Sequence, residues 1–212
     1  LLCRLGETQS KLKGSFLRKS KEHPVVGDWV LNHYNDEGIS MIETLCERKS
    51  AFSRIDFSGH AAGDVKTVKR QVLAANFDQV FILTSMNRDF NLNRIMRFIC
   101  LTLRGGGKPV VILTKADLCE DPKIYIRQVE QLTDQVQVFA VSAKTGYGMA
   151  LVKALLKRGD IIALLGSSGV GKSTLVNALA GKEMMKVSAV REKDARGRHT
   201  TTHRQMLELP SG

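Results

Sequence analysis

The sequence lacks the features that mark membrane-spanning, exported and zinc-binding proteins. It contains no uninterrupted apolar run of about 18 residues, so we expect no transmembrane helix and no membrane partner. No basic segment followed by an apolar segment opens the chain, so we expect no signal peptide. The four cysteines form no Cys-x-x-Cys pair and have no histidine at zinc-finger spacing, which favours reduced thiols in a cytoplasmic protein; they are Cys3, Cys46, Cys100 and Cys119.

The sequence also has no internal repeat and no low-complexity segment. Its 43% hydrophobic and 25% charged residues are typical of a soluble globular protein of one or two domains, rather than a disordered or fibrous one. Acidic residues are few beside basic ones, 21 against 32, which gives a net charge of +11. This charge favours a polyanionic partner such as RNA or DNA, the alternative being a basic surface without such a partner.

The residue pattern changes near residues 53–70. Before this point, short strand-like runs at residues 14–18, 28–34 and 38–45 are separated by turn signals, with a hairpin turn over residues 35–38. We therefore predict a small all-β barrel over residues 1–52. That length is short for a closed five-stranded barrel, so we expect its first strand to be missing. Residues 53–70 have little periodicity and predict a linker or loop.

Residues 71–212 predict an α/β domain. Apolar runs at residues 79–84, 109–114, 136–141 and 161–165 are typical of buried parallel strands. A helix is predicted over residues 91–104, and Asp121-Pro122 predicts the start of another. The expected apolar stripe of the first helix comprises Leu92, Ile95, Met96, Ile99, Cys100 and Leu103. Strands that alternate with helices indicate βαβ units in a parallel sheet.

A phosphate-binding loop follows the last of these strands and precedes a helical run. It fits the pattern G-x-x-x-x-G-K-[ST] and comprises Gly166, Ser167, Ser168, Gly169, Val170, Gly171, Lys172 and Ser173, followed by Thr174. We expect its backbone N–H groups and the helix N-terminus to bind phosphate oxygens. Lys172 is expected to reach the β- and γ-phosphates, and the Ser173 hydroxyl to bind Mg²⁺. The alternative is a glycine-rich turn that binds nothing.

Two further motifs follow strands of the same sheet and predict guanine recognition. Thr114, Lys115 and Asp117 end one strand, and Ser142, Ala143 and Lys144 end another. Ligands bind outside the carboxyl ends of parallel strands, so both motifs should lie at the edge that carries the phosphate loop. There Asp117 can accept hydrogen bonds from guanine N1–H and the 2-amino group, which adenine does not offer. The Ala143 N–H can donate to O6, and the Lys115 stem can lie along the base.

The order of these motifs is permuted, because ordinary small GTPases carry the phosphate loop first and the guanine motifs last. With its strand-rich first part, the chain resembles the ribosome small-subunit-dependent GTPase family called RsgA or YjeQ in bacteria. Further matching stretches are residues 23–30, 48–54, 74–76, 89–92 and 198–203.

This resemblance implies an OB-fold that contacts 16S rRNA, followed by a circularly permuted GTPase domain. It implies GTP as substrate, GDP as product, Mg²⁺, stimulation by the small (30S) ribosomal subunit, and a monomeric factor in late 30S maturation. A zinc-binding C-terminal domain normally follows, so Zn²⁺ is expected only in a domain not present here. The chain departs from the family pattern in ending before the expected Asp-x-x-Gly of the second switch, and in carrying Thr114 where many GTPases have asparagine. We expect one bracing hydrogen bond to change with Thr114.

The resemblance places the first switch at residues 184–203, which are basic and poor in apolar residues. We expect one threonine of residues 200–202, with Thr201 favoured, to join Ser173 as a Mg²⁺ ligand. No glutamine is available to orient the attacking water, so His199 is the candidate for this role, with Lys172 and Thr201 as the other catalytic residues. The alternatives are a solvated threonine-rich loop and an exposed loop histidine.

Basic residues also cluster in the predicted barrel and favour contact with rRNA; they are Lys11, Lys13, Arg18, Lys19 and Lys21. Trp29 shares a strand face with Leu31, which favours a core position for it over stacking on a base. Two alternatives to a ribosome-linked GTPase remain: a P-loop ATPase, and an RNA-binding module that binds nucleotide without turnover.

Overall fold

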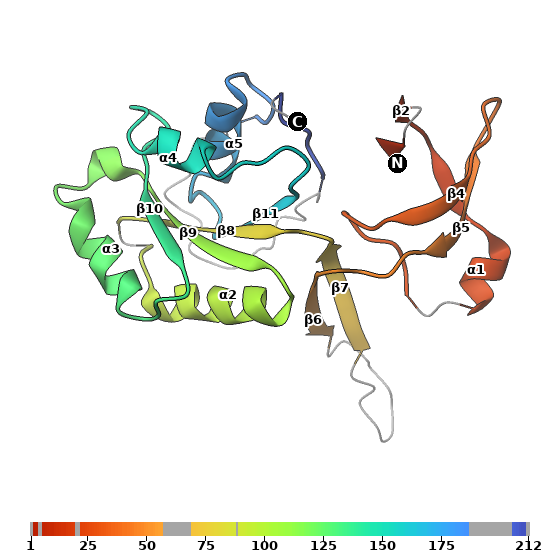
Figure 1. Cartoon of the computed structure of the whole chain (residues 1–212), viewed down its shortest axis with the longest axis horizontal. Coiled ribbons are helices and arrows are strands. Elements are labelled where there is room, and N and C mark those ends of the chain that lie inside the picture. The colour runs from red at the N-terminus through yellow and green to blue at the C-terminus, as the bar shows by residue number, and fades with distance from the viewer. Residues whose placement is uncertain are drawn as a thin grey trace. The chain divides into compact units, whose positions relative to one another are not determined.

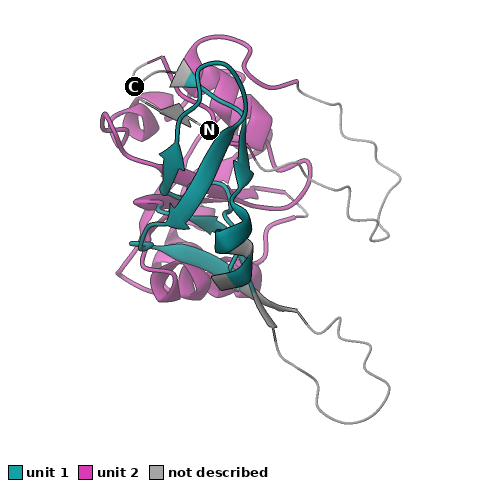
Figure 2. Cartoon of the chain, turned by 90° about the vertical axis from the view of Figure 1, so that its right-hand side faces the viewer, with its two compact units in different colours: residues 1–76 teal, residues 77–212 magenta. Residues whose placement is uncertain are grey.

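The computed structural model describes residues 2–3, 6–19, 22–56, 69–87, 89–186 and 205–210. The chain divides into two compact units, Leu1–Asn76 and Phe77–Gly212, which are coloured separately in Figure 2. Among the described residues, no helix is long and apolar enough to cross a membrane.

Unit 1 is built from small sheets. Strands β3 (Ser10–Leu12), β5 (Ser40–Leu45) and β4 (Val30–His33) form one sheet in the order β3-β5-β4, and β1 (Leu2–Cys3) pairs with β2 (Gly6–Glu7) in another. The antiparallel β4–β5 pair confirms the predicted hairpin. The described strands of unit 1 lie in separate two- and three-stranded sheets, so the OB-fold barrel stays a prediction.

Two predictions for unit 1 are wrong. Residues 14–18 form no strand but most of helix α1 (Gly14–Lys19), which buries the side chain of Phe16 and so needs no alternating pattern. Trp29 does not lie in the core, since its side chain is 61% exposed and that of Leu31 is 59% exposed. The face that Trp29 and Leu31 share was expected to be buried, but in the described part of unit 1 it is exposed.

The predicted linker also differs from the structure. Strand β6 (Ala51–Asp56) pairs antiparallel with β7 (Lys69–Ala75), so both ends of the expected linker at residues 53–70 belong to a ladder. The backbone hydrogen bonds of this ladder outweigh the polar composition of the segment. Residues 57–68 lie outside the described residues.

Three stretches quoted for the family resemblance meet inside unit 1. The buried Asn76 has a left-handed backbone (φ 58°), accepts a hydrogen bond from Lys49 N–H at 2.9 Å and donates one to Gly27 O at 2.9 Å. The Arg48 guanidinium donates to both carboxylate oxygens of Asp28, at 2.7 and 2.8 Å. These contacts give the three stretches a structural role in joining distant parts of the unit.

Unit 2 contains the predicted parallel sheet of four strands, and their order is β10-β9-β8-β11. Its strands are β8 (Gln79–Ser85), β9 (Lys108–Thr114), β10 (Gln137–Ala140) and β11 (Ile162–Leu165). Strands β8 and β9 are buried almost throughout, as near-continuous apolar sequences require. In Figure 1, helices α2 (Leu92–Arg104) and α3 (Pro122–Glu130) cover one face, and α4 (Met149–Lys153) and α5 (Lys172–Ala180) cover the other.

The helix starts follow the sequence signals. Asn91 caps α2 by accepting from Arg94 N–H, and Asp121 caps α3 by accepting from Lys123 N–H, with proline at its first turn. The apolar stripe of α2 is narrower than predicted, because the residues buried against the sheet are Ile95, Ile99 and Thr102. Cys100 is exposed, so its expected place on the buried face is wrong.

Candidate nucleotide-binding site

The three motif segments lie at the carboxyl edge of the parallel sheet. Strand β11 leads into the loop at residues 166–171, and the ends of β9 and β10 lead into the other two segments. The register pairs Ser85 with Thr114, so β8 and β9 end together, and it pairs Leu165 with Ile82, so β11 ends at a position inside β8 on the same side of the sheet. Parallel pairing therefore brings segments from residues 114, 142 and 166 onward to one rim.

The phosphate loop needs glycine at two positions for different reasons. A Cβ atom on Gly166 would lie 2.7 Å from the carbonyl oxygen of Leu83, so the strand leaves no room for a side chain. Gly171 has a φ of 105°, a left-handed conformation that side chains disfavour, and precedes the first residue of α5. The loop thus turns tightly between strand and helix, which directs the free N–H groups of the helix N-terminus at the rim.

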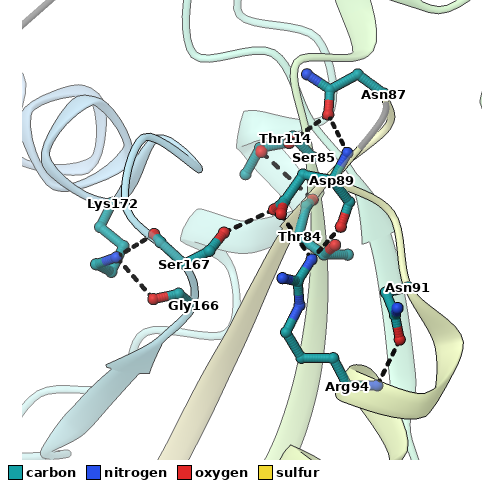
Figure 3. Close-up of polar contacts among 10 residues, drawn as sticks. All are labelled: Thr84, Ser85, Asn87, Asp89, Asn91, Arg94, Thr114, Gly166, Ser167 and Lys172. Atoms are coloured by element: carbon teal, nitrogen blue, oxygen red, sulfur yellow. Dashed lines mark hydrogen bonds and ion pairs between the residues drawn. The ribbon is translucent and has the colours of Figure 1, made fainter. Parts of the chain in front are cut away.

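Lys172 is held in place by the loop that it follows. Its ammonium group donates to Gly166 O at 2.9 Å and to Ser167 O at 2.6 Å, as Figure 3 shows. An ammonium group has three donors, so one N–H remains for a phosphate oxygen. Burial lowers the pKa of Lys172, and the carboxylate of Asp89 opposes this shift.

Thr114 joins the strand that carries the base motif to the phosphate loop. Its buried hydroxyl donates to Val170 O at 2.6 Å and lies 3.3 Å from Thr84 O. We expected the bracing hydrogen bond to change where threonine stands in place of asparagine. The hydroxyl nevertheless reaches the loop, so a direct link between the two segments is present.

Asp117 and Ser142 join the two guanine motifs. The buried Ser142 hydroxyl donates to Asp117 Oδ1 at 2.7 Å and accepts from Thr145 N–H at 3.2 Å. This hydrogen bond is the main cause that lowers the pKa of Asp117, with smaller contributions from Lys144 and Lys115. The Asp117 residue is exposed at the rim.

Sequence reasoning missed a polar network behind the phosphate loop. Asp89 Oδ2 accepts from the Ser167 hydroxyl at 2.6 Å, and Asp89 Oδ1 accepts from Arg94 at 2.7 Å. Arg94 also donates to the backbone oxygen of Asp89, while Asn87 Oδ1 accepts from Asp89 N–H and from the Ser85 hydroxyl. The sequence offered only the stretch 89–92 as a family match, with no role attached, because nothing in it shows that Asp89 meets Ser167.

Comparisons with known proteins agree with this arrangement. The family described as RsgA GTPase matches residues 45–212. The chain belongs to this family. It is 40% identical over 201 residues to the small ribosomal subunit biogenesis GTPase RsgA 1 of Listeria monocytogenes, which covers 94% of this chain and 54% of that protein. The corresponding protein of Methanosarcina acetivorans is 38% identical over 205 residues, covering 96% of this chain and 53% of that one.

Two solved structures have the same fold. YjeQ from Thermotoga maritima is 28% identical with a TM-score of 0.62, over 83% of this chain and 58% of that one. YloQ, described as a circularly permuted GTPase, is 20% identical with a TM-score of 0.55, over 81% of this chain and 54% of that one. The fold is therefore that of a permuted P-loop GTPase. The chain spans about half the length of the curated RsgA relatives that it matches.

Of the remaining residues predicted for the RsgA-type site, four are described by the structure and two are not. Ser173 and Thr174 are half-buried in the first turn of α5, Ala143 is half-buried, and Lys144 is exposed. The Ser173 hydroxyl is a hard oxygen donor beside the phosphate subsite, which fits a Mg²⁺ ion that takes its other ligands from phosphate and water. Thr201 and His199 lie outside the described residues, so their roles stay predictions.

Removing the Ser142 hydroxyl should raise the pKa of Asp117. Ser142→Ala deletes the donor that stabilises the carboxylate, so Asp117 should take up its proton at a higher pH than in the unsubstituted chain. In the unsubstituted chain, the stability that this hydrogen bond gives is lost as the pH falls through the lowered folded-state pKa of Asp117, whereas the variant lacks this contribution at every pH. NMR titration of the Asp117 carboxyl carbon measures the shift. Thr133→Ala, which removes a turn hydroxyl before β10, is the control; identical Asp117 curves in all three chains would contradict the assignment.

Proposed function

We propose that the chain binds GTP and hydrolyses it to GDP and phosphate, as the names of its RsgA relatives imply for those proteins. The observation that supports this most is the direct linkage of the three motifs. Thr114 bonds to the phosphate loop, and Ser142 bonds to Asp117. One rim therefore carries a phosphate-binding loop and a hydrogen-bond acceptor for the base.

Asp117 is the proposed guanine-reading residue. Its Oδ1 already accepts from Ser142, so the carboxylate is fixed in direction and remains ionised. Guanine offers two neighbouring donors, N1–H and the 2-amino group, and a fixed carboxylate can accept from both. Adenine lacks these donors, so its binding would give the carboxylate no partner in the base. This disfavours the alternative of a P-loop ATPase.

The phosphate loop is the proposed site of charge neutralisation. Lys172 places its positive charge beside the β- and γ-phosphates and donates its remaining N–H to a phosphate oxygen, and the N–H groups at the start of α5 surround the phosphate oxygens. Ser173, with Thr201 as second protein ligand, would hold Mg²⁺, which neutralises charge that develops on the phosphates. His199 would orient the attacking water. Positioning and charge stabilisation by these residues make up most of the proposed catalysis.

The proposed partner is the small (30S) ribosomal subunit, contacted through 16S rRNA by unit 1 of a cytoplasmic monomer in late subunit maturation. Trp29 and Leu31 are exposed aromatic and apolar side chains of the unit that also carries the basic segment. Within that segment, Lys11 and Arg18 are exposed, while Lys13 is paired with Glu43 at 2.6 Å. Lys21 lies outside the described residues, as does the Lys19 side chain. The family's Zn²⁺ site would belong to a further domain, and no cluster of metal-ligating side chains occurs among the residues described here.

Asp117→Asn should change the preferred base. Asparagine offers one acceptor and one donor, which match N1–H and the 2-carbonyl of xanthine instead of the two donors of guanine. We expect GDP affinity to fall by roughly ten- to a hundredfold and XDP affinity to rise, measured by competition against a fluorescent nucleotide. Asp121→Asn, which changes an aspartate at the start of α3, is the control. Equal GDP affinity in the Asp117 variant and the unsubstituted chain would exclude Asp117 as the reader.

His199→Ala should separate binding from turnover. Phosphate release is measured with and without 30S subunits, and we expect stimulation by the subunit in the unsubstituted chain. Losing the water-orienting imidazole should lower the stimulated rate by about a hundredfold or more while GTP affinity stays the same. His203→Ala is the matched control for a histidine in the same segment. Unchanged stimulated turnover would remove His199 from the reaction, and binding without any release would favour a nucleotide-dependent RNA-binding module.

Trp29→Ala should weaken binding to 16S rRNA. An exposed indole can stack on a base, and its loss costs roughly tenfold in affinity. Trp29→Phe keeps an aromatic face and should retain most of the affinity, whereas Leu103→Ala removes an exposed apolar side chain of unit 2 and should have no effect. Filter binding across a salt series measures both affinity and phosphate contact. A flat salt response or equal affinity of Trp29→Ala would contradict this RNA interface.

A further inference from the structure

The phosphate loop is held from behind by a side chain outside its own motif. Asp89 lies in the segment between β8 and α2, far from the loop in sequence, and accepts the Ser167 hydroxyl at 2.6 Å. A hydroxyl–carboxylate hydrogen bond of this length is charge-assisted and stronger than a neutral one. In Figure 3, the Asp89 carboxylate lies between Ser167 and Arg94.

Asp89 is itself fixed on three sides. Arg94 from the first turn of α2 pairs with its second carboxylate oxygen at 2.7 Å and also donates to its backbone oxygen. Asn87 accepts from its N–H at 2.9 Å. The side chains of Asp89 and Arg94 are 33% and 27% exposed, so the pair is partly shielded from water. A carboxylate with this much support can restrain the residue that it binds.

Ser167 connects this restraint to Lys172. The backbone oxygen of Ser167 accepts from the Lys172 ammonium at 2.6 Å, and its hydroxyl donates to Asp89. A chain of contacts therefore runs from α2 through Arg94, Asp89 and Ser167 to the lysine expected at the β-phosphate. Rotation of Ser167 would displace the carbonyl oxygen that holds Lys172.

We propose that Asp89 is a positioning residue for nucleotide binding, which fixes the phosphate loop through Ser167 so that the ammonium group of Lys172 is aimed at the β-phosphate. The proposal rests on the proposed nucleotide-binding function. Arg94 neutralises the carboxylate, so that it does not repel the phosphates. Asp89 does not touch the base motif, so its contribution depends on the phosphates and not on guanine.

The test compares GMP, GDP and GTP binding to the unsubstituted chain and to Asp89→Ala, Ser167→Ala and the double variant by calorimetry. Both single variants should lose about tenfold in affinity for GDP and GTP, since a charge-assisted hydrogen bond is removed. GMP has no β-phosphate, so its affinity should change less than twofold. The double variant should bind no more weakly than either single variant, because both substitutions delete the same contact.

Two variants of helix α2 serve as a matched test of the change in charge. Arg94→Met leaves Asp89 unneutralised and should weaken GDP binding, whereas Arg97→Met removes an equal charge from an exposed position of the same helix and should not. Asp89→Asn should bind GDP more weakly than the unsubstituted chain, because one amide cannot accept from both Ser167 and Arg94. Tighter GDP binding by Asp89→Asn would show that repulsion dominates and would overturn the proposal. Equal loss for GMP and GDP, or additive effects of the two single variants, would also overturn it.

These outcomes are distinct from failure of the proposed function. If the unsubstituted chain binds none of the guanine nucleotides, both the function and this inference are wrong. If it binds GDP with high affinity and the Asp89 and Ser167 variants bind equally well, only the positioning role is wrong. Thermal unfolding of each variant shows whether a lost affinity reflects lost folding, in which case all three nucleotides would be affected alike.

Discussion

Parallel pairing of four strands, of which β8 and β9 are buried almost throughout, is the constraint on which the site depends. Because β11 runs parallel to β8, and β8 parallel to β9, the segments that follow the three strands leave the sheet on one side, so residues distant in sequence share one rim. Two hydrogen bonds then join the segments that follow the strands: Thr114 to Val170, and Ser142 to Asp117. Permutation of the motif order leaves this geometry unchanged, because the rim depends on which strands are neighbours and not on which comes first in the chain.

The sheet and its rim could be predicted because their signals are local. Near-continuous apolar runs, Asn91 and Asp121 as caps, and the glycine pattern at 166–171 each act within a few residues, and the structure has the four strands and the helix starts where these signals place them. Residues 79–84, for example, are apolar on both faces of a strand, so they are stable only where both faces of the sheet are covered.

Contacts between distant segments could not be predicted in the same way. The burial of Phe16 in α1, the exposure of Trp29 and the β6–β7 ladder each depend on what packs against the segment, which composition does not show. The same holds for Asp89, whose partner Ser167 lies in another element. In unit 1, Arg48 pairs with Asp28, and Asn76 donates to Gly27 O. These contacts give the stretches that match the family a role in folding that needs no ligand.

The central claim is that one rim binds a purine nucleotide by its phosphates and reads its base as guanine. Titration calorimetry of the chain with GDP and with ADP, each with magnesium, tests it most directly. The account predicts one binding site for GDP and no measurable heat with ADP, because adenine offers no donors to Asp117. Absence of binding with GDP, or equal affinities for the two nucleotides, would contradict it.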